Sequence, residues 1–393
     1  MSNKDLDSAF TELFHRQPEA HFSAPGRTEI GGNHTDHQHG RVLAAAINLD
    51  TRAATASNGS NLIRIQSEGY AYFEVNLSNL EPEASEQGTA KALVRGVAAR
   101  ISQLGHNVTG FDACIVSDVL PGSGLSSSAA FEVLIGTIIN ERDRCGLTPV
   151  EIARIGQYAE NVYFGKPCGL MDQTASSVGN LLTIDFSDPT APDVKPLNVD
   201  FSVFGHSLCI IDSGADHSDL TGEYSSITDE LKSVSRFFGK EYLREVNEEQ
   251  FYASIPELRK TAGDRAVLRA MHVFEENRRV TAQVSALERG DFPAFLELVK
   301  ASGRSSWLYL QNVVPTGSTV CQELALSLAV CEKLLGGRGA CRVHGGGFAG
   351  TVQAFVPNDM LDEFKCRIES FLGEGSCHVM NIRREGGIKE DKE

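Results

Sequence analysis

The sequence predicts an α+β protein of two lobes. In the first half of the 393-residue chain, short apolar and β-branched runs alternate with segments in which apolar residues recur three and four apart. A second region opens with a strand-like run at 207–214 and continues through helix-rich sequence from about 228 to 298. Helices and strands interspersed in this way favour the α+β class. We place the lobes at 1–195 and 196–393.

The elements of the first lobe follow from local periodicity. The apolar residues Leu6, Phe10, Leu13 and Phe14 have helical spacing with acidic residues between them, which indicates an N-terminal helix. Strands are expected at 42–48, 61–67, 73–77 and 111–119, and helices at 89–104, 129–142 and 148–164.

The sequence at the end of the second lobe divides clearly into predicted strands and a helix. Residues 340–357 contain two short strands around a glycine turn, residues 360–373 have helical periodicity, and residues 378–383 form a closing strand. With 41% hydrophobic residues, a chain of this length can bury a sizeable core.

The charge balance excludes some partners. The chain carries 36 basic and 52 acidic side chains, a formal net charge of −16. Such a surface repels nucleic acid and anionic lipid, so we expect neither as a partner. A small anion such as ATP remains possible, because a few local cations outweigh the distant field within a Debye length.

The nine cysteines form no C-x-x-C pair, and several lie inside apolar runs. This pattern is typical of reduced, structural thiols in a cytoplasmic protein. We see no signal peptide at the N-terminus and no apolar run long enough to span a bilayer, and we therefore expect a cytoplasmic location.

The run LPGSGLSSSAAFE at 120–132 follows a strand-like segment and opens a helix-like one. Gly122 and Gly124 let the backbone turn tightly and approach a ligand, and the N–H groups at a helix start favour a bound phosphate. The Gly-Lys-Ser/Thr ending of a Walker A loop is missing. A serine-capped helix after a glycine turn is the alternative interpretation.

A second segment, APGRTEIGGNHTDHQHG at 24–40, combines a cation, carboxylates and hydrogen-bonding side chains. A sugar needs such donors and acceptors for its hydroxyl groups. His34, His37 and His39 also suggest a metal site, although their spacing matches no zinc pattern. A solvated polar loop is the third possibility.

A third segment, RVHGGGFAGTVQ at 342–353, holds four glycines within six residues. This density suggests a close approach of the backbone to a ligand or to the first glycine loop. A hairpin turn between two strands is the alternative.

In this order, the three segments resemble the motifs of the GHMP kinase superfamily, over residues 22–355. PGSGLSSSAA at 121–130 resembles the phosphate loop, and GGGFAGT at 345–351 resembles the C-terminal glycine motif. The 24–40 segment and AENVYFGKPCGLMDQTASSVG at 159–179 are similar to galactokinase signatures. The resemblance implies a two-lobed GHMP kinase fold with its active site in the cleft between the lobes.

The same resemblance implies phosphorylation of the anomeric hydroxyl of galactose by ATP. Asp172 matches the catalytic base of the family, and Arg27 matches the cation that assists it. For Asp172, a helix N-cap is the structural alternative. Ser128 and Glu160 match the magnesium ligands, twelve residues separating Glu160 from Asp172. ATP would lie on the loop residues Gly122, Ser123, Gly124, Leu125, Ser126, Ser127 and Ser128.

The sugar contacts implied by the resemblance are Asn33, His34, Thr35, Asp36 and Tyr224. Asn33 departs from the family, which usually has a glutamate there that contacts the 6-hydroxyl group. An amide can donate to a 6-carboxylate, so galacturonate is an alternative to galactose. A kinase of another related sugar and a non-catalytic sugar-sensing relative are the remaining alternatives. The intact serine loop argues against the last of these.

Overall fold

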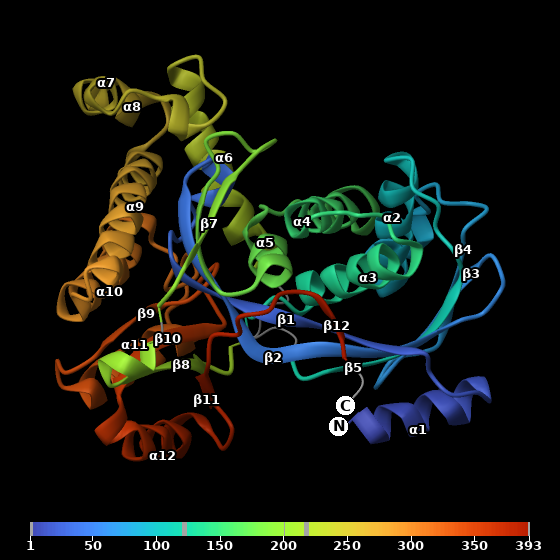
Figure 1. The fold of residues 1–393 in the computed structure, drawn as a ribbon. Coiled ribbons are helices and arrows are strands. Elements are labelled where there is room, and N and C mark those ends of the chain that lie inside the picture. Colours follow the sequence, from blue (N-terminus) through green and yellow to red (C-terminus); the bar gives the residue numbers. More distant parts are fainter. Residues whose placement is uncertain (1–2, 120–123, 200, 216–219, 392–393) are drawn as a thin grey trace.

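The structure is a computed structural model that describes residues 3–119, 124–199, 201–215 and 220–391 (Figure 1). Its strands are β1 (Ala20–Gly31), β2 (Arg41–Ser57), β3 (Leu62–Ser67), β4 (Phe73–Asn76), β5 (Phe111–Ser117), β6 (Leu181–Asp185), β7 (Asp193–Leu197), β8 (His206–Asp212), β9 (Ala340–Val343), β10 (Thr351–Pro357), β11 (Cys377–Met380) and β12 (Ile388–Glu390). Its α-helices are α1 (Asn3–Phe14), α2 (Ala90–Gln103), α3 (Ser127–Asp143), α4 (Pro149–Tyr158), α5 (Met171–Val178), α6 (Thr221–Phe237), α7 (Glu248–Ala253), α8 (Ile255–Thr261), α9 (Asp264–Glu288), α10 (Phe292–Ser305), α11 (Glu323–Leu335) and α12 (Leu361–Leu372).

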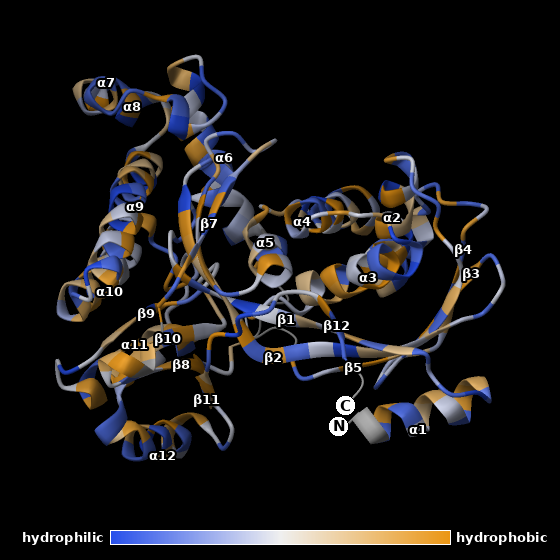
Figure 2. Ribbon diagram, viewed as in Figure 1, coloured by the Kyte–Doolittle hydropathy of each residue, from blue (hydrophilic) through white to orange (hydrophobic). Residues whose placement is uncertain are grey.

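The first lobe is organised around a large mixed sheet. Within the described ranges, eight strands form it: the order is β12-β1-β2-β5-β3-β4, with β6 paired to β2 and β7 to β6. Helices α2 to α5 cover one face, and α1 lies on the other (Figure 1). Leu6 and Phe10 of α1 are buried against β2 and β5, with Ala9 and Phe14 packed beside them, and hydrophilic residues alternate with these along the helix (Figure 2). The N-terminal helix is therefore amphipathic, as its spacing predicted.

The second lobe contains an antiparallel sheet whose described strands have the order β11-β8-β10-β9. The long helices α9 and α10 connect this sheet to the first lobe. Phe292 and Phe295 of α10 pack edge-on against Phe355 of β10, in a core that also includes Ile30 and Leu43 of the first sheet. Because this core crosses from one sheet to the other, the two lobes are held together by buried apolar surface.

Most predicted elements are present, with informative differences. The helices predicted at 89–104 and 129–142 are α2 and α3. The helix predicted at 148–164 divides into α4 and a π-helical turn at Ala159–Phe164. The strand predicted at 378–383 is β11, but the chain then returns to the first sheet, where Ile388 of β12 pairs with Ser23 of β1. The boundary at residue 196 stays a prediction, and the last strand lies outside the lobe to which we assigned it.

The segment 24–40 is not a solvated loop: residues 24–31 belong to strand β1, residues 36–38 form a short 3-10 turn, and no residue of the segment is exposed. Every residue of β1 except His21 is buried, and β1 pairs with β2 with register shifts between Pro25 and Arg27 and between Glu29 and Gly31. Such irregularities change the direction of side chains along a strand, and β1 carries two charged residues, Arg27 and Glu29, in buried positions. Among the described helices, none is both long and apolar enough to cross a bilayer.

Candidate active site

The start of α3 forms one wall of the site. Gly124 has a φ of +70°, and Ser126, directly before the helix, has a φ of 56°. These two left-handed residues reverse the chain so that α3 begins at Ser127. The first N–H groups of a helix lack intrahelical partners and attract phosphate. Gly122 and Ser123, which we also assigned to this loop, lie outside the described residues.

Arg27 and Asp172 form the central ion pair. Arg27 Nε and Nη2 donate to the two carboxylate oxygens of Asp172 over 2.7 and 2.6 Å. Arg27 also donates to the carbonyl oxygen of Gly124, and its backbone N–H donates to the carbonyl oxygen of Leu125 over 3.0 Å. This arginine therefore joins β1, the phosphate loop and α5. Its side chain is buried, whereas that of Asp172 is 32% exposed and can be reached by a ligand.

Burial raises the pKa of Asp172, but the ion pair with Arg27 outweighs burial, and the pKa lies below its ordinary value. The hydroxyl group of Ser126 also donates to this carboxylate. Asp172 is thus ionised near neutral pH. The alternative role as a helix N-cap does not apply, since Asp172 lies within the first turn of α5 and Leu170 occupies the N-cap position.

Ser128 and Glu160 lie together beside the phosphate loop. The π-helical turn after α4 carries Glu160, and Ser128 Oγ donates to its Oε1 over 3.2 Å. Lys166 Nζ lies 3.3 Å from the same oxygen, and Gln173 donates to the other over 2.9 Å. A hydroxyl and a carboxylate are the hard oxygen donors that Mg²⁺ takes alongside phosphate and water. The donor set fits this ion.

Gln173 links Glu160 to a second buried carboxylate. Its amide nitrogen lies 3.0 Å from Glu132 and 2.9 Å from Glu160. Burial and the charge of Glu160 raise the pKa of Glu132 well above its ordinary value. The sequence interpretation included neither residue.

Asp36 lies in the short turn after β1 and lines a cavity of about 480 Å³. The α-carbon of Gly169 passes so close that a β-carbon there would lie 1.9 Å from Asp36 Oδ2. Burial and the charge of Asp172 raise the pKa of Asp36 to about 6. The cavity thus has an acceptor for sugar hydroxyl groups next to the Arg27–Asp172 pair.

His34 lines the same cavity, but both of its ring nitrogens have protein partners. His34 Nε2 donates to the carbonyl oxygen of Gly346 over 3.0 Å, and Nδ1 accepts from His37 Nε2 over 3.1 Å. His37 Nδ1 in turn accepts from Gln38 over 3.2 Å. The histidines are therefore fixed as neutral rings. Among the described residues, no group of three His, Cys, Asp or Glu side chains is placed to hold a metal.

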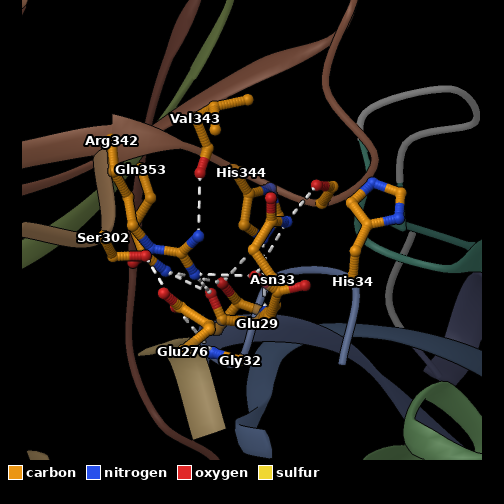
Figure 3. A network of polar contacts seen from close by, with 12 residues as sticks. Glu29, Gly32, Asn33, His34, Glu276, Ser302, Arg342, Val343, His344 and Gln353 are labelled. Atoms are coloured by element: carbon orange, nitrogen blue, oxygen red, sulfur yellow. Dashed lines mark hydrogen bonds and ion pairs between the residues drawn. The ribbon is translucent and has the colours of Figure 1, made fainter. Parts of the chain in front are cut away.

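Asn33 and Thr35, which we expected to contact the sugar, are not among the residues that line the cavity. Both are fully buried. Asn33 Nδ2 donates to Glu29 over 3.3 Å and lies within hydrogen-bond distance of the carbonyl oxygen of Gly345 (Figure 3). The hydroxyl group of Thr35 lies 2.8 and 2.6 Å from the carbonyl oxygens of Gly32 and Arg41. His34 between them has a φ of 57°, and this left-handed residue directs its neighbours inward.

The C-terminal glycine loop closes the site from the second lobe. Its three successive carbonyl oxygens, at Gly345, Gly346 and Gly347, accept from Asn33, His34 and Tyr224. Gly346 has no room for a side chain, because a β-carbon would lie 2.6 Å from the Tyr224 ring. The third segment therefore contacts the second through its backbone, and Tyr224 lines the cavity from α6.

A second cavity of about 350 Å³ adjoins the phosphate loop. Its wall is mainly apolar and includes Leu93, Ile115, Phe131 and Phe164, with Ser127 and Ser128 at the end nearest the loop. A flat apolar space beside a phosphate-binding helix start is suited to a nucleotide base.

Comparisons with known proteins agree with this geometry. Residues 8–57 match the galactokinase galactose-binding signature, and residues 92–180 match the GHMP kinases N-terminal domain. The crystal structure of Lactococcus lactis galactokinase complexed with galactose is similar at a TM-score of 0.85 and 24% identity, covering 99% of this chain and all of that one. A mevalonate kinase is similar at a TM-score of 0.63 and 14% identity, over 93% of this chain and 99% of that one. The fold is that of the GHMP kinases, as predicted.

Two curated sequences are more similar. The galactokinase of Mannheimia succiniciproducens is 32% identical over 395 residues, which cover 100% of this chain and 97% of that protein. The galactokinase of Actinobacillus pleuropneumoniae is 33% identical over 93% of this chain and 90% of its own. The chain therefore belongs to the galactokinase family.

Proposed function

We propose that this protein is a sugar kinase that transfers the γ-phosphoryl group of ATP to the anomeric hydroxyl group of galactose. The observation that carries the proposal is the Arg27–Asp172 pair, which lies between the start of α3 and the cavity that contains Asp36. Such a position brings an acceptor for the hydroxyl proton next to a phosphate-binding helix start. The curated relatives named galactokinase support the choice of galactose.

Asp172 accepts the proton of the anomeric hydroxyl group as the oxygen attacks the γ-phosphorus. Its lowered pKa makes it a weak base, so the transfer of the proton accompanies rather than precedes phosphoryl transfer. Arg27 remains charged and stabilises the negative charge that spreads over the transferring group. Asp36 accepts from ring hydroxyl groups and thereby orients the anomeric oxygen toward Asp172.

ATP would place its phosphates at the start of α3 and its base in the apolar cavity beside the loop. Ser128 and Glu160 would hold Mg²⁺, which supplies charge neutralisation between the β- and γ-phosphates. Lys166, 3.3 Å from Glu160 in this structure, would then be close enough to this site to contact a phosphate oxygen.

The test is ADP release by the purified protein with Mg-ATP and a panel of sugars containing galactose, arabinose, N-acetylgalactosamine and glucose. We expect turnover of galactose to exceed that of glucose by at least 100-fold, because an axial and an equatorial C4 hydroxyl group meet Asp36 differently. Binding of ATP and galactose without turnover of any sugar would refute the kinase proposal and favour the sugar-sensing alternative.

The magnesium site has its own test. Glu160→Gln removes the charged ligand and keeps the hydrogen-bonding shape of the side chain, so the Mg²⁺ concentration for half-maximal rate should rise about tenfold or more. Titration of Mg²⁺ at saturating ATP and galactose measures it. Glu151→Gln, on the exposed start of α4, is the matched control and should leave the titration unchanged. An unchanged titration in Glu160→Gln would remove Glu160 from the site.

A further inference from the structure

The carboxylate that we assign to magnesium is held by a buried glutamine. Gln173 lies in the first turn of α5, directly after Asp172. Its amide nitrogen donates to Glu160 Oε2 over 2.9 Å and to Glu132 Oε2 over 3.0 Å. Glu160 comes from the π-helical turn after α4, and Glu132 comes from α3. One amide therefore joins three segments of the first lobe.

The orientation of the Gln173 amide follows from its partners. An amide nitrogen has two N–H groups, one for each carboxylate, whereas the amide oxygen can only accept. A reversed amide would direct its oxygen at Glu160 with no hydrogen between the two oxygen atoms. The side chains of Gln173, Glu132 and Glu160 are buried, so water does not compete for these contacts. The amide nitrogen is thus fixed against Glu160.

The backbone of α4 packs closely against this group. A β-carbon at Gly156 would lie 3.1 Å from Glu132 Oε2 and 3.2 Å from Cγ of Gln173. Both side chains therefore fill the space beside the glycine, and a close-packed interior leaves them little room to change their positions.

The two carboxylate oxygens of Glu160 have different partners. Oε2 accepts from Gln173, whereas Oε1 lies 3.2 Å from Ser128 Oγ and 3.3 Å from Lys166 Nζ. Mg²⁺ demands nearly ideal octahedral geometry, so a ligand oxygen of fixed direction suits this ion. A carboxylate that is held at one oxygen keeps the other directed toward Ser128, the second proposed ligand.

We propose that Gln173 and Glu132 are positioning residues of the magnesium site: Gln173 holds Glu160 so that Oε1 faces the ion, and Glu132 holds Gln173. The inference rests on the proposed function, because it takes Ser128 and Glu160 as the ligands of the ion. Both positioning residues act through Glu160. The loss of such a partner of a metal ligand typically lowers metal affinity by roughly 10- to 100-fold.

The experiment measures the binding of a non-hydrolysable ATP analogue by calorimetry, with and without Mg²⁺. The dissociation constant without the ion, divided by that with the ion, reports the affinity of the protein–nucleotide complex for Mg²⁺. We call this quotient the metal ratio. Gln173→Met removes the donor and keeps the length of the side chain, and we expect the metal ratio to fall about tenfold. A purely structural role would weaken both binding reactions alike and leave the metal ratio unchanged.

Glu132 offers a matched pair of variants. Glu132→Met removes the acceptor for Gln173 and should lower the metal ratio in the same direction, whereas Glu132→Gln keeps an acceptor oxygen and should retain it. Gln283→Met is the control for the loss of a buried glutamine. Gln283 is fully buried in α9, away from α3 (Figure 1), and its replacement should leave the metal ratio unchanged.

The double variant Gln173→Met/Glu160→Gln tests whether Gln173 acts through Glu160. Once the charged ligand is lost, its orientation no longer matters, so the double variant should have the metal ratio of Glu160→Gln alone. Losses that add in the double variant would mean that Gln173 acts independently of Glu160 and would overturn the inference.

The single variants separate this inference from the proposed function. A wild-type metal ratio in Gln173→Met, beside a lowered one in Glu160→Gln, would overturn the inference and leave the proposed magnesium ligand standing. An unchanged metal ratio in Glu160→Gln would refute the proposed ligand, and the inference with it.

Discussion

Two arginine–carboxylate pairs join strand β1 to distant parts of the chain, and they differ in how far solvent and ligands can reach them. The Arg27–Asp172 pair lies in the cleft, with side chains 8% and 32% exposed. The Arg342–Glu29 pair lies beneath it, with side chains 0% and 4% exposed and a separation of 2.8 Å (Figure 3). Glu29 and Arg27 are two residues apart on β1, so the same strand supplies one charge to each pair. We call Arg27–Asp172 the reachable pair and Arg342–Glu29 the sealed pair.

The sealed pair belongs to a network that connects the two lobes. Arg342 Nη2 also donates to the carbonyl oxygen of Glu29 over 2.9 Å, and Gln353 donates to it over 2.7 Å. His344, whose pKa burial lowers well below its ordinary value, accepts from the backbone N–H of Glu29 over 3.3 Å. The comparison teaches that similar ion pairs can have different tasks: the partly exposed carboxylate of Asp172 can be reached by a ligand, as our proposal requires, and the buried one of Glu29 fixes the glycine loop against β1.

The largest effect should come from the reachable pair. Asp172→Asn keeps the size of the side chain and removes its basicity, so we expect kcat to fall about 10³-fold. The measurement is ADP release at saturating ATP and sugar. Asp112→Asn, which changes a carboxylate paired with Arg16 over 2.6 Å on β5, is the matched control and should change kcat less than twofold. Equal losses in both variants would mean that Asp172 has no catalytic role.

Breaking the sealed pair should lower the stability of the protein more than breaking the reachable pair. Arg342→Met leaves the carboxylate of Glu29 buried without its countercharge, so we expect a loss of about 3 kcal/mol in the free energy of unfolding. Asp172→Asn should lose only about 1 kcal/mol, because water and the new amide still reach Arg27. Urea unfolding monitored by circular dichroism measures both variants.

The double variant Arg342→Met/Glu29→Gln separates a lost contact from an unpaired charge. Neutralising Glu29 should recover more than half of the loss, since the remaining polar groups keep hydrogen-bond partners. No recovery would show that packing of the Arg342 side chain, and not charge pairing, explains the loss. Similar losses in Arg342→Met and Asp172→Asn would remove the distinction between the two pairs.

The sequence predicted the reachable pair and could not predict the sealed one. Arg27, Asp172 and Glu160 belong to contiguous motifs, and the structure places Arg27 with Asp172 and Ser128 with Glu160. Glu29 and Arg342 are separated by 313 positions, and nothing in either local pattern indicates their pairing. A sealed pair depends on how two lobes pack, which local periodicity does not report.

The remaining errors have local causes. Strand β1 was not predicted, because its proline and glycines are unfavourable in strands and its charged residues suggested exposure. The burial of Asn33 and Thr35 was not apparent either, because it accompanies a left-handed backbone at His34 that the sequence does not indicate.

The smallest effect concerns Asp36, a carboxylate in the cleft that forms no ion pair with an arginine of the described residues. Its pKa is raised from 3.8 to about 6, because burial and the charge of Asp172 oppose ionisation. The folded protein therefore binds this proton more tightly than the unfolded chain, and the contribution of Asp36 to stability is lost as the pH rises from about 4 to about 6. Asp36→Asn removes this loss while weakening the binding of sugar.

We therefore expect Asp36→Asn to be more stable than the wild-type protein above pH 6, by about 1 kcal/mol after allowance for partial exposure, with the difference vanishing below pH 4. Urea unfolding without sugar at pH 4, 5, 6 and 7.5 measures the difference, and the KM for sugar should rise at least tenfold in the same variant. A difference in stability that does not change with pH would mean that burial and the charge of Asp172 do not oppose the ionisation of Asp36. The expected result would extend the comparison: Glu29 is paired with Arg342 inside the protein, whereas the proposed partner of Asp36 is the sugar, so its burial lowers stability when no sugar is bound.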